Sequence, residues 1–349
     1  MILFLTLSVG LWVLGHQMRT PKRARWIMIG LLYVLVLVLM VVLPESHGLR
    51  RSLGASFAEW GALGILALVV MGYRTVLAQM KSKAEDVERA AMPAPKPGSF
   101  QADELERYAR HIMLREIGGP GQKRLKSAKV LVIGAGGLGS PALMYLAAAG
   151  VGTIGVIDDD LVESTNLQRQ IAHTDARIGM PKVFSAERAM KEVNPYVEVH
   201  PYHRRLSAEI ARDLIGEYDL VLDGTDNFDT RYLVNDACVA LGKPLISGAL
   251  TQWEGQISLF DPAHGAPCYA CVFPQAPAAG LAPSCAEAGV LGPLPGVVGA
   301  MMAVEAVKVI VDAGQGLAGR MLIYDALYAE TRVISLERRG DCATCGAPS

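Results

Sequence analysis

The sequence lacks an excess of charge of either sign. Its 33 lysines and arginines nearly balance its 34 aspartates and glutamates, which leaves a net charge of −1 at pH 7. Proteins that bind nucleic acid concentrate positive charge to neutralise phosphates, so this balance gives no support for a nucleic-acid partner. The chain also contains no visible internal repeat. Its length of 349 residues favours one large domain with appendages.

The N-terminus lacks the features of a cleaved signal peptide. Its first apolar stretch, Met1 to Gly15, has no basic region in front of it, and no small-x-small cleavage site precedes the basic residues that follow. We therefore predict an uncleaved anchor. The stretch is short for a membrane span, so a buried core helix is the alternative.

Long apolar runs are present, and they lie before residue 76. Apolar residues make up 51% of the chain. Trp26 to Leu43 contains no charged residue, and Ala55 to Tyr73 contains only Glu59, near its start. Each run approaches the length of about 20 residues that crosses a bilayer as a helix. We predict that residues 1–76 form a membrane anchor with two to three transmembrane helices, with buried core helices as the alternative.

Basic residues set the expected orientation of this anchor. The positive-inside rule places the densest basic cluster, between the first two apolar runs, in the cytoplasm and the N-terminus outside. Three spans then make a multi-pass protein of the inner (cytoplasmic) membrane with its remaining domain in the cytoplasm. The basic residues that flank the runs are Arg19, Lys22, Arg23, Arg25, Arg50, Arg51, Arg74, Lys81 and Lys83.

The composition changes again over residues 77–100. Lys81 to Ala91 is charged and Met92 to Gly98 is rich in proline. Such segments bury too little apolar surface to hold a fold. We predict a semi-extended linker here, followed by a second domain over residues 101–349.

The second domain contains an apolar run that ends in a glycine-rich turn. Val130 to Ile133 predicts a buried parallel strand, and the Ala- and Leu-rich segment after the turn predicts a helix. Between them Gly134, Gly136 and Gly139 form a G-x-G-x-x-G pattern that also contains Gly137. Such a turn leaves N–H groups free at a helix N-terminus, where phosphate oxygens bind. A nucleotide site is expected, with a purely structural tight turn as the alternative.

Carboxylates follow two further predicted strands. Asp158 follows the next strand, and Asp226 and Asn227 follow another apolar run that ends at Asp223. The carboxyl ends of parallel strands meet in one crevice, so we expect Asp158 to accept hydrogen bonds from ribose hydroxyls there. Asp226 is expected to hold magnesium beside a triphosphate. The glycine turn and Asp158 alone suit NAD and ATP equally.

Two cations behind the glycine turn favour a polyphosphate ligand. Arg169 lies in the polar run Glu163 to Gln170, and Lys182 follows Pro181 at an expected helix start. Arginine offers bidentate geometry and lysine a point charge. Each alone is more often a surface residue, but together they predict contacts to phosphates.

The cysteines include two C-x-x-C pairs. Cys268 with Cys271, and Cys342 with Cys345, can each supply half of a tetrahedral zinc site. The pairs are far apart in sequence, so such a site requires the C-terminus to fold back onto the domain. A disulfide or redox role is the alternative, which a cytoplasmic domain disfavours.

The two remaining cysteines stand alone. Cys285 lies in a loop rich in glycine, alanine and proline, and its thiol is a candidate acyl acceptor, although the sequence shows no base beside it. Cys238 lies on an apolar helical face and is expected in the core. Helices are also expected over Leu105 to Leu114 and over Val297 to Val311.

Together these motifs resemble the MoeB/ThiF/HesA group, which is related to ubiquitin-activating enzymes. The resemblance covers about Leu105 to Gly346 and leaves out the apolar N-terminal runs. It implies an α/β fold in which a Rossmann-like, mostly parallel sheet continues into a β-rich half with a four-cysteine zinc site. It rests on the glycine turn and on an ordered set of segments: 107–111, 166–170, 179–182, 225–227, 268–271 and 342–346.

The resemblance also implies a reaction. The group uses ATP and Mg²⁺ to adenylate the C-terminal Gly-Gly carboxylate of a ubiquitin-like sulfur carrier, and releases pyrophosphate. Cys285 matches a cysteine that some members use for a thioester or acyl-persulfide step. Carried over to this chain, the resemblance implies that magnesium binds Asp226 and that Arg110 reaches into the partner's site of a homodimer. It implies that zinc binds Cys268, Cys271, Cys342 and Cys345. The implied nucleotide contacts are Gly134, Gly136, Gly137, Gly139, Asp158, Asn166, Gln168, Arg169, Lys182, Asp226 and Asn227.

We therefore expect a membrane-anchored, homodimeric adenylyltransferase of the small subunit of molybdopterin synthase (MoaD type). The same chemistry on the thiamine-pathway carrier (ThiS type) is the nearest alternative. The class of NAD(P)-dependent oxidoreductases is a further alternative, but it gives no evident role to Arg169, Lys182 and Asp226. The intact set of charged residues argues against an inactive membrane scaffold.

Overall fold

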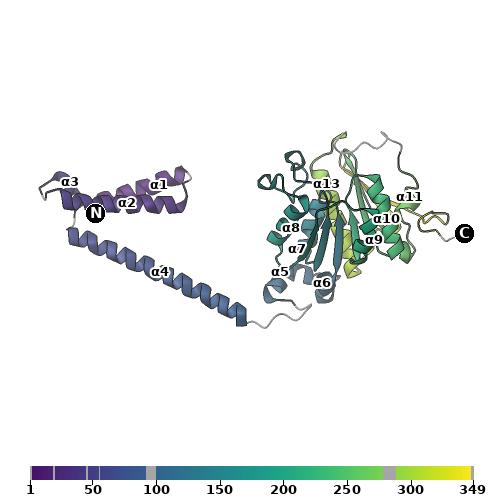
Figure 1. The fold of residues 1–349 in the computed structure, drawn as a ribbon, viewed down its shortest axis with the longest axis horizontal. Helices are drawn as coiled ribbons and strands as arrows, with labels where there is room; N and C mark the ends of the chain where they lie inside the picture. Colours follow the sequence, from purple (N-terminus) through teal and green to yellow (C-terminus); the bar gives the residue numbers. More distant parts are fainter. Residues whose placement is uncertain are drawn as a thin grey trace. The chain divides into compact units, whose positions relative to one another are not determined.

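The computed structural model describes residues 2–18, 20–44, 46–54, 56–91, 100–277 and 288–346. The chain divides into two compact units, Met1–Ala94 and Pro95–Ser349 (Figure 1). Each unit has a buried apolar core of its own.

The N-terminal unit is helical throughout most of its described length. Helices α1 and α2 pack against each other, and α2 also contacts α4. The rings of Phe4 in α1 and Trp60 in α4 meet edge to face at 5.2 Å, and their neighbours in the shared core include Val36, Met40 and Leu53. The helices are α1 Ile2–Gln17, α2 Lys22–Val42, α3 Gly48–Leu53 and α4 Phe57–Ala91.

Within the described part of this unit, two helices are long and apolar enough to cross a membrane, over Ala24–Val42 and Phe57–Lys81. Helix α1 is apolar but only 16 residues long. A third helix that meets the same criteria, α13 (Pro293–Val311), belongs to the second unit, where half of its length is buried. Length and composition therefore allow spans at α2 and α4, whereas α13 serves a protein core.

Helix α4 differs from the linker that the sequence predicted. We expected a semi-extended tether over residues 77–100, but α4 continues unbroken to Ala91. From Arg74 to Ala91 the sequence contains neither glycine nor proline and is rich in Ala, Lys, Glu and Gln, which favour helix. Extending an existing helix also avoids the cost of a new nucleus. The proline-rich segment, residues 92–99, lies outside the described residues.

One sheet of eight strands organises the second unit, in the order β3-β2-β1-β4-β5-β6-β7-β8. The strands from β3 to β5 pair in parallel, and β5 to β8 pair antiparallel. This is the predicted Rossmann-like sheet that continues into a β-rich half. The strands are β1 Lys129–Ile133, β2 Thr153–Ile157, β3 Glu198–Tyr202, β4 Leu220–Asp223, β5 Leu245–Leu250, β6 Glu254–Phe260, β7 Arg320–Asp325 and β8 Glu330–Ser335.

Helices cover both faces of the sheet (Figure 1). Alternate residues of β1 enter two different cores: Val130 and Val132 join the core of α7, α8 and α13, and Leu131 and Ile133 join that of α9 and α10. Burial on both faces explains why the run is apolar throughout. The other helices are α5 Ala102–Ile112, α6 Gly118–Ser127, α7 Gly139–Ala149, η1 Ser164–Asn166, η2 Asp175–Arg177, α8 Lys182–Val193, α9 Ala208–Gly216, α10 Phe228–Leu241, η3 Pro262–His264 and α11 Tyr269–Val272.

Three helix starts differ from the predicted ones by a few residues. Helix α5 begins at Ala102 because Gln101 and Glu104 form a capping box before it. Pro181 precedes α8 as its cap and does not form its first turn. The core helix expected from Val297 begins at Pro293, where a proline near the first turn is tolerated.

Candidate active site

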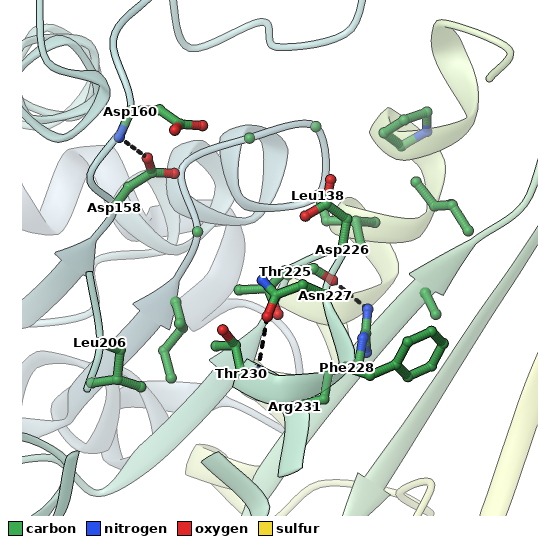
Figure 2. Close-up of a pocket in the computed structure, with 18 of the residues that line it drawn as sticks. Leu138, Asp158, Asp160, Leu206, Thr225, Asp226, Asn227, Phe228, Thr230 and Arg231 are labelled. Carbon is green, nitrogen blue, oxygen red and sulfur yellow. Dashed lines mark hydrogen bonds between the residues drawn. The ribbon is translucent and has the colours of Figure 1, made fainter. Parts of the chain in front are cut away.

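A cavity of about 840 Å³ opens at the carboxyl ends of β1, β2 and β4. The strand order reverses between β1 and β4, and ligands of such sheets bind in the crevice at this point. The glycine turn after β1, Asp158 after β2 and Asp226 after β4 all line the cavity (Figure 2). The sheet thus brings together residues as distant in sequence as Gly134 and Asp226.

The glycine turn has a backbone that only glycine allows at two of its positions. Gly134 has a φ of +92°, which residues with a side chain rarely adopt. A Cβ at Gly139 would lie 1.9 Å from the carbonyl oxygen of Gly134. Within the described residues, no acceptor takes the N–H groups of Gly136 and Gly137. These N–H groups at the N-terminal end of α7 favour a bound anion.

Asp158 holds the turn from the β2 side. Its Oδ2 accepts from the N–H of Ala135 at 2.7 Å. Its Oδ1 accepts from the N–H of Asp160 at 2.8 Å (Figure 2). Burial raises the pKa of Asp158, against the lowering effect of the Lys182 ammonium. Lys182 is 5% exposed, and its Nζ lies 2.7 Å from Oδ2 of Asp160. One buried cation is thereby held at a fixed place beside the cavity.

Asp226 lies on the opposite side, at the start of α10 (Figure 2). Its side chain is exposed and makes no hydrogen bond or ion pair with any residue of the described segments. The next residue, Asn227, caps α10, because its Oδ1 accepts from the N–H of Thr230 at 2.9 Å. The segment is therefore fixed, while the Asp226 carboxylate remains available to a ligand.

Arg231 is a cavity residue that the sequence analysis missed. It is 5% exposed, donates to the carbonyl oxygens of Thr225 and Gly248, and lies 3.6 Å from the buried carboxylate of Asp223. It thereby holds the loop that carries Asp226. The only available signal was its place one turn into the helix after a strand that ends in a carboxylate. Arg204 and Arg205 also line the cavity, and they follow β3 without a recognisable motif.

Arg169 and Asn166 line a further side of the cavity. The Nη2 of Arg169 donates to Oδ1 of Asn166 at 3.1 Å, which orients the guanidinium. The predicted residues that the cavity brings together are Gly134, Gly136, Gly137, Asp158, Asn166, Arg169, Lys182, Asp226 and Asn227.

Three predicted residues do not line the cavity. Gly139 is buried behind the turn. The side chain of Gln168 packs against Gly292, where an added Cβ would lie 2.5 Å from the Oε1 of Gln168. Arg110 lies on the exposed side of α5. These three are therefore not placed to contact a ligand in this cavity. Cys285 lies outside the described residues.

The four paired cysteines come together in a buried cluster. Their sulfur atoms all lie within 4.8 Å of one another. Three of the separations are 3.4, 3.6 and 3.9 Å, close to the roughly 3.8 Å that tetrahedral zinc with 2.3 Å bonds requires. A disulfide needs about 2.05 Å. The C-terminus folds back as expected, and the cluster consists of Cys268, Cys271, Cys342 and Cys345.

The surroundings of the cluster differ from one thiol to the next. Burial raises the pKa of Cys268 and of Cys271. Burial acts in the same direction on Cys342, but hydrogen bonds from the backbone of Cys345 and Thr344, together with those from the thiols of Cys271 and Cys268, lower the pKa of Cys342 to about 7. Cys238, by contrast, is 2% exposed and lies in the core as predicted.

Comparison with known proteins identifies relatives of this domain. Residues 108–344 match the sequence model of the ThiF family. The sulfur carrier protein adenylyltransferase of Thermus thermophilus is 51% identical over 248 residues, which cover 70% of this chain and 92% of that protein. The SAMP-activating enzyme E1 of Haloferax volcanii is 47% identical over 248 residues, which cover 71% and 91%.

A longer relative and two solved structures extend the comparison. The adenylyltransferase and sulfurtransferase MOCS3 of Bos taurus is 47% identical over 255 residues, which cover 73% of this chain and 56% of that protein. Escherichia coli MccB, solved with MccA-N7isoASN, has a TM-score of 0.62 at 24% identity and covers 69% of this chain and 75% of that one. PaaA has a TM-score of 0.60 at 20% identity, with 80% and 90% covered. The two structures share the fold of the sheet domain.

Proposed function

The chain belongs to the ThiF family and is a nucleotidyltransferase, and from this premise we propose that it adenylates the C-terminal Gly-Gly carboxylate of a ubiquitin-like sulfur carrier. ATP is the co-substrate and pyrophosphate leaves. One observation carries the proposal: the free N–H groups of the glycine turn, Lys182 and Asp226 surround one cavity. Hydride transfer to a nicotinamide needs neither a buried lysine nor a free carboxylate at that place, whereas a triphosphate under attack needs both charges.

The reaction depends on positioning more than on proton transfer. The carrier's carboxylate is already a nucleophile, and it attacks the α-phosphorus of ATP in line with the leaving group. The new carboxyl–phosphate bond forms as the bond to the β-phosphate oxygen breaks, and pyrophosphate leaves with that electron pair. The N–H groups of Gly136 and Gly137 and the cations of Lys182 and Arg169 bind the phosphate oxygens on which charge builds up.

We assign a magnesium ion to Asp226. Its carboxylate faces the cavity and has no partner among the described residues, which suits a hard cation that keeps several of its waters. When bound, magnesium neutralises charge on the triphosphate. Asp158 accepts from the ribose hydroxyls on the other side of the glycine turn.

We assign a structural zinc ion to the four-cysteine cluster. Its sulfur separations fit a tetrahedral ion, and all four thiols are buried. Zinc would tie the C-terminal segment to α10 and α11, where the Thr344 hydroxyl also donates to Asp236 at 3.1 Å. The cluster belongs to the fold of the domain and lies outside the residues that line the cavity.

We propose the small subunit of molybdopterin synthase (MoaD type) as the carrier, in line with the family resemblance of the sequence. The test compares ATP–pyrophosphate exchange by the full chain in detergent with this carrier and with the thiamine-pathway carrier (ThiS type). We expect kcat/KM to be at least about tenfold higher with the MoaD type, the size of a modest difference in binding. A preference for the ThiS type would reassign the pathway and leave the chemistry in place.

We propose that the enzyme acts as a homodimer in which Arg110 completes the partner's site. Arg110 is exposed on α5 and does not line the cavity of its own subunit. A mixture of Arg110→Ala and Lys182→Gln chains, each inactive alone, should regain exchange activity, because mixed dimers contain one site with both cations. Absence of recovery in dimers shown to be mixed would contradict the role of Arg110.

We propose that α2 and α4 anchor the enzyme as part of a multi-pass segment in the inner (cytoplasmic) membrane, with the catalytic domain in the cytoplasm. The expected result is that the full chain stays in the membrane pellet after an alkaline carbonate wash, because about 20 apolar residues per span hold it there. A chain that begins at Phe100 should be recovered in the supernatant. Protease should digest the catalytic domain in inverted vesicles only, and digestion in intact spheroplasts would reverse the orientation.

A further inference from the structure

His173 is a buried side chain that lies between the glycine turn and helix α8. It is 5% exposed and is not among the described residues that line the cavity. Its Nε2 lies 2.9 Å from the carbonyl oxygen of Ala135, in the glycine turn, and its Nδ1 lies 2.9 Å from Oγ of Ser185, in α8. The ring therefore connects two elements that both contact the phosphates in the proposed reaction.

The carbonyl partner of the ring determines which ring nitrogen carries a hydrogen. A carbonyl oxygen only accepts, so Nε2 carries the hydrogen that it donates to Ala135. Burial lowers the pKa of His173, against the raising effect of the hydrogen bond to the Ala135 carbonyl, and the nearby charges of Lys182 and Arg177 also lower it. The ring is thus neutral, and Nδ1 accepts from the Ser185 hydroxyl, which is fully buried.

The backbone around Ala135 is held from three sides. Its N–H donates to Asp158 at 2.7 Å, and its carbonyl oxygen accepts from Ser140 Oγ at 3.3 Å as well as from His173. Ala135 stands between Gly134 and Gly136, so its position sets the direction of the free N–H groups of the turn. His173 links this carbonyl to the body of α8 through Ser185, whereas the Asp158 contact reaches Lys182, at the start of α8, through Asp160.

Helix α8 begins with Lys182, one turn before Ser185. Ala135, His173 and Ser185 therefore form a continuous hydrogen-bonded chain from the glycine turn to the helix that carries the phosphate-binding lysine. A shift of about 1 Å between such groups is enough to lower a rate by about a hundredfold. The chain of hydrogen bonds is placed to prevent that shift.

We propose that His173 is a positioning residue that holds the glycine turn and Lys182 in register for the triphosphate. The proposal rests on the proposed adenylation, because it gives a role to the same phosphate site. His173 itself contacts no substrate. It acts through the Ala135 carbonyl and the Ser185 hydroxyl.

The test compares two substitutions of His173 with a matched control in the full chain in detergent. His173→Leu removes both hydrogen bonds, whereas His173→Gln keeps an amide N–H for the Ala135 carbonyl. We expect His173→Leu to raise the Kd and the KM for ATP by about tenfold and to lower kcat for exchange by a similar factor. The KM for the carrier should not change. His173→Gln and Ser185→Ala should lie between His173→Leu and the wild type.

The control is Asn194→Ala, at another buried contact of the domain. Asn194 is fully buried, and its Nδ2 donates to Tyr108 and to the carbonyl of Ala147 at 2.7 Å each. This variant should lower the melting temperature without changing the KM for ATP. The proposal is overturned if folded His173→Leu binds ATP like the wild type, or if His173→Gln recovers none of the affinity. ATP binding needs no carrier, so it can be measured independently of exchange. If the wild-type protein binds ATP but does not catalyse exchange, the proposed adenylation is contradicted, whereas the proposed role of His173 in ATP binding can still be tested.

Discussion

Replacing Lys182 with glutamine is expected to lower kcat for carrier-dependent ATP–pyrophosphate exchange by about 10³-fold, the usual cost of removing one preorganised charge from a transition state. Lys182 is 5% exposed, and its Nζ is held 2.7 Å from Asp160 at the side of the cavity. A cation fixed in that way needs no rearrangement when charge builds up on the phosphates. The KM for ATP should change less than kcat, because the contact strengthens in the transition state.

The matched control for this substitution is Lys191→Gln. Lys191 lies on the same helix, α8, but its side chain is exposed on the surface and does not line the cavity. Its replacement makes the same change of charge and should leave kcat within about twofold of the wild type. If Lys182→Gln retained wild-type kcat, phosphate stabilisation by this lysine would be ruled out.

Replacing Cys342 with serine is expected to remove zinc and to lower the melting temperature by an amount on the order of 10 °C, because metal binding to such sites is coupled to folding. Cys342 Sγ lies 3.6 Å from that of Cys268, and the two belong to segments far apart in sequence. Without the ion, the C-terminal segment loses its main connection to α10 and α11. Metal analysis and thermal unfolding of the purified full chain measure both effects.

Cys238→Ala controls for the loss of any buried thiol. Cys238 is 2% exposed, and it packs in the core of α9 and α10 away from the cluster. This variant should keep one zinc per chain and lose less stability than Cys342→Ser. Equal zinc content in the wild type and Cys342→Ser would contradict the four-cysteine site, and the cluster would then require another explanation.

The sequence predicted those parts of the site that depend on short segments of the chain. The run before Gly134 is apolar because β1 is buried on both faces, and the glycines are required by the backbone that follows. The carboxyl ends of parallel strands meet at one edge, so the sequence alone places Asp158 and Asp226 at the same crevice. Two C-x-x-C pairs likewise predict a four-cysteine cluster without knowledge of the fold.

The residues that the sequence did not reveal depend on contacts between distant segments. Arg231 owes its role to the carbonyl of Gly248 and the carboxylate of Asp223, and nothing in its neighbourhood marks those partners. The proposed role of His173 likewise depends on its hydrogen bonds to Ala135, 38 positions away, and to Ser185. The prediction for residues 77–91 was wrong for a different reason. Their charged composition suggested a tether, but their helix propensity extends the preceding apolar helix, so α4 continues to Ala91.

The most direct test of adenylation is ATP–pyrophosphate exchange by the full chain with a carrier whose C-terminal Gly-Gly is intact or deleted. Exchange should require the intact tail, because the terminal carboxylate must reach the α-phosphorus between the glycine turn and Lys182. A carrier without the two glycines should give no signal above background, although it keeps its folded domain. Exchange that is equal with both carriers, or absent with the intact carrier in protein that binds ATP, would contradict adenylation of a Gly-Gly tail.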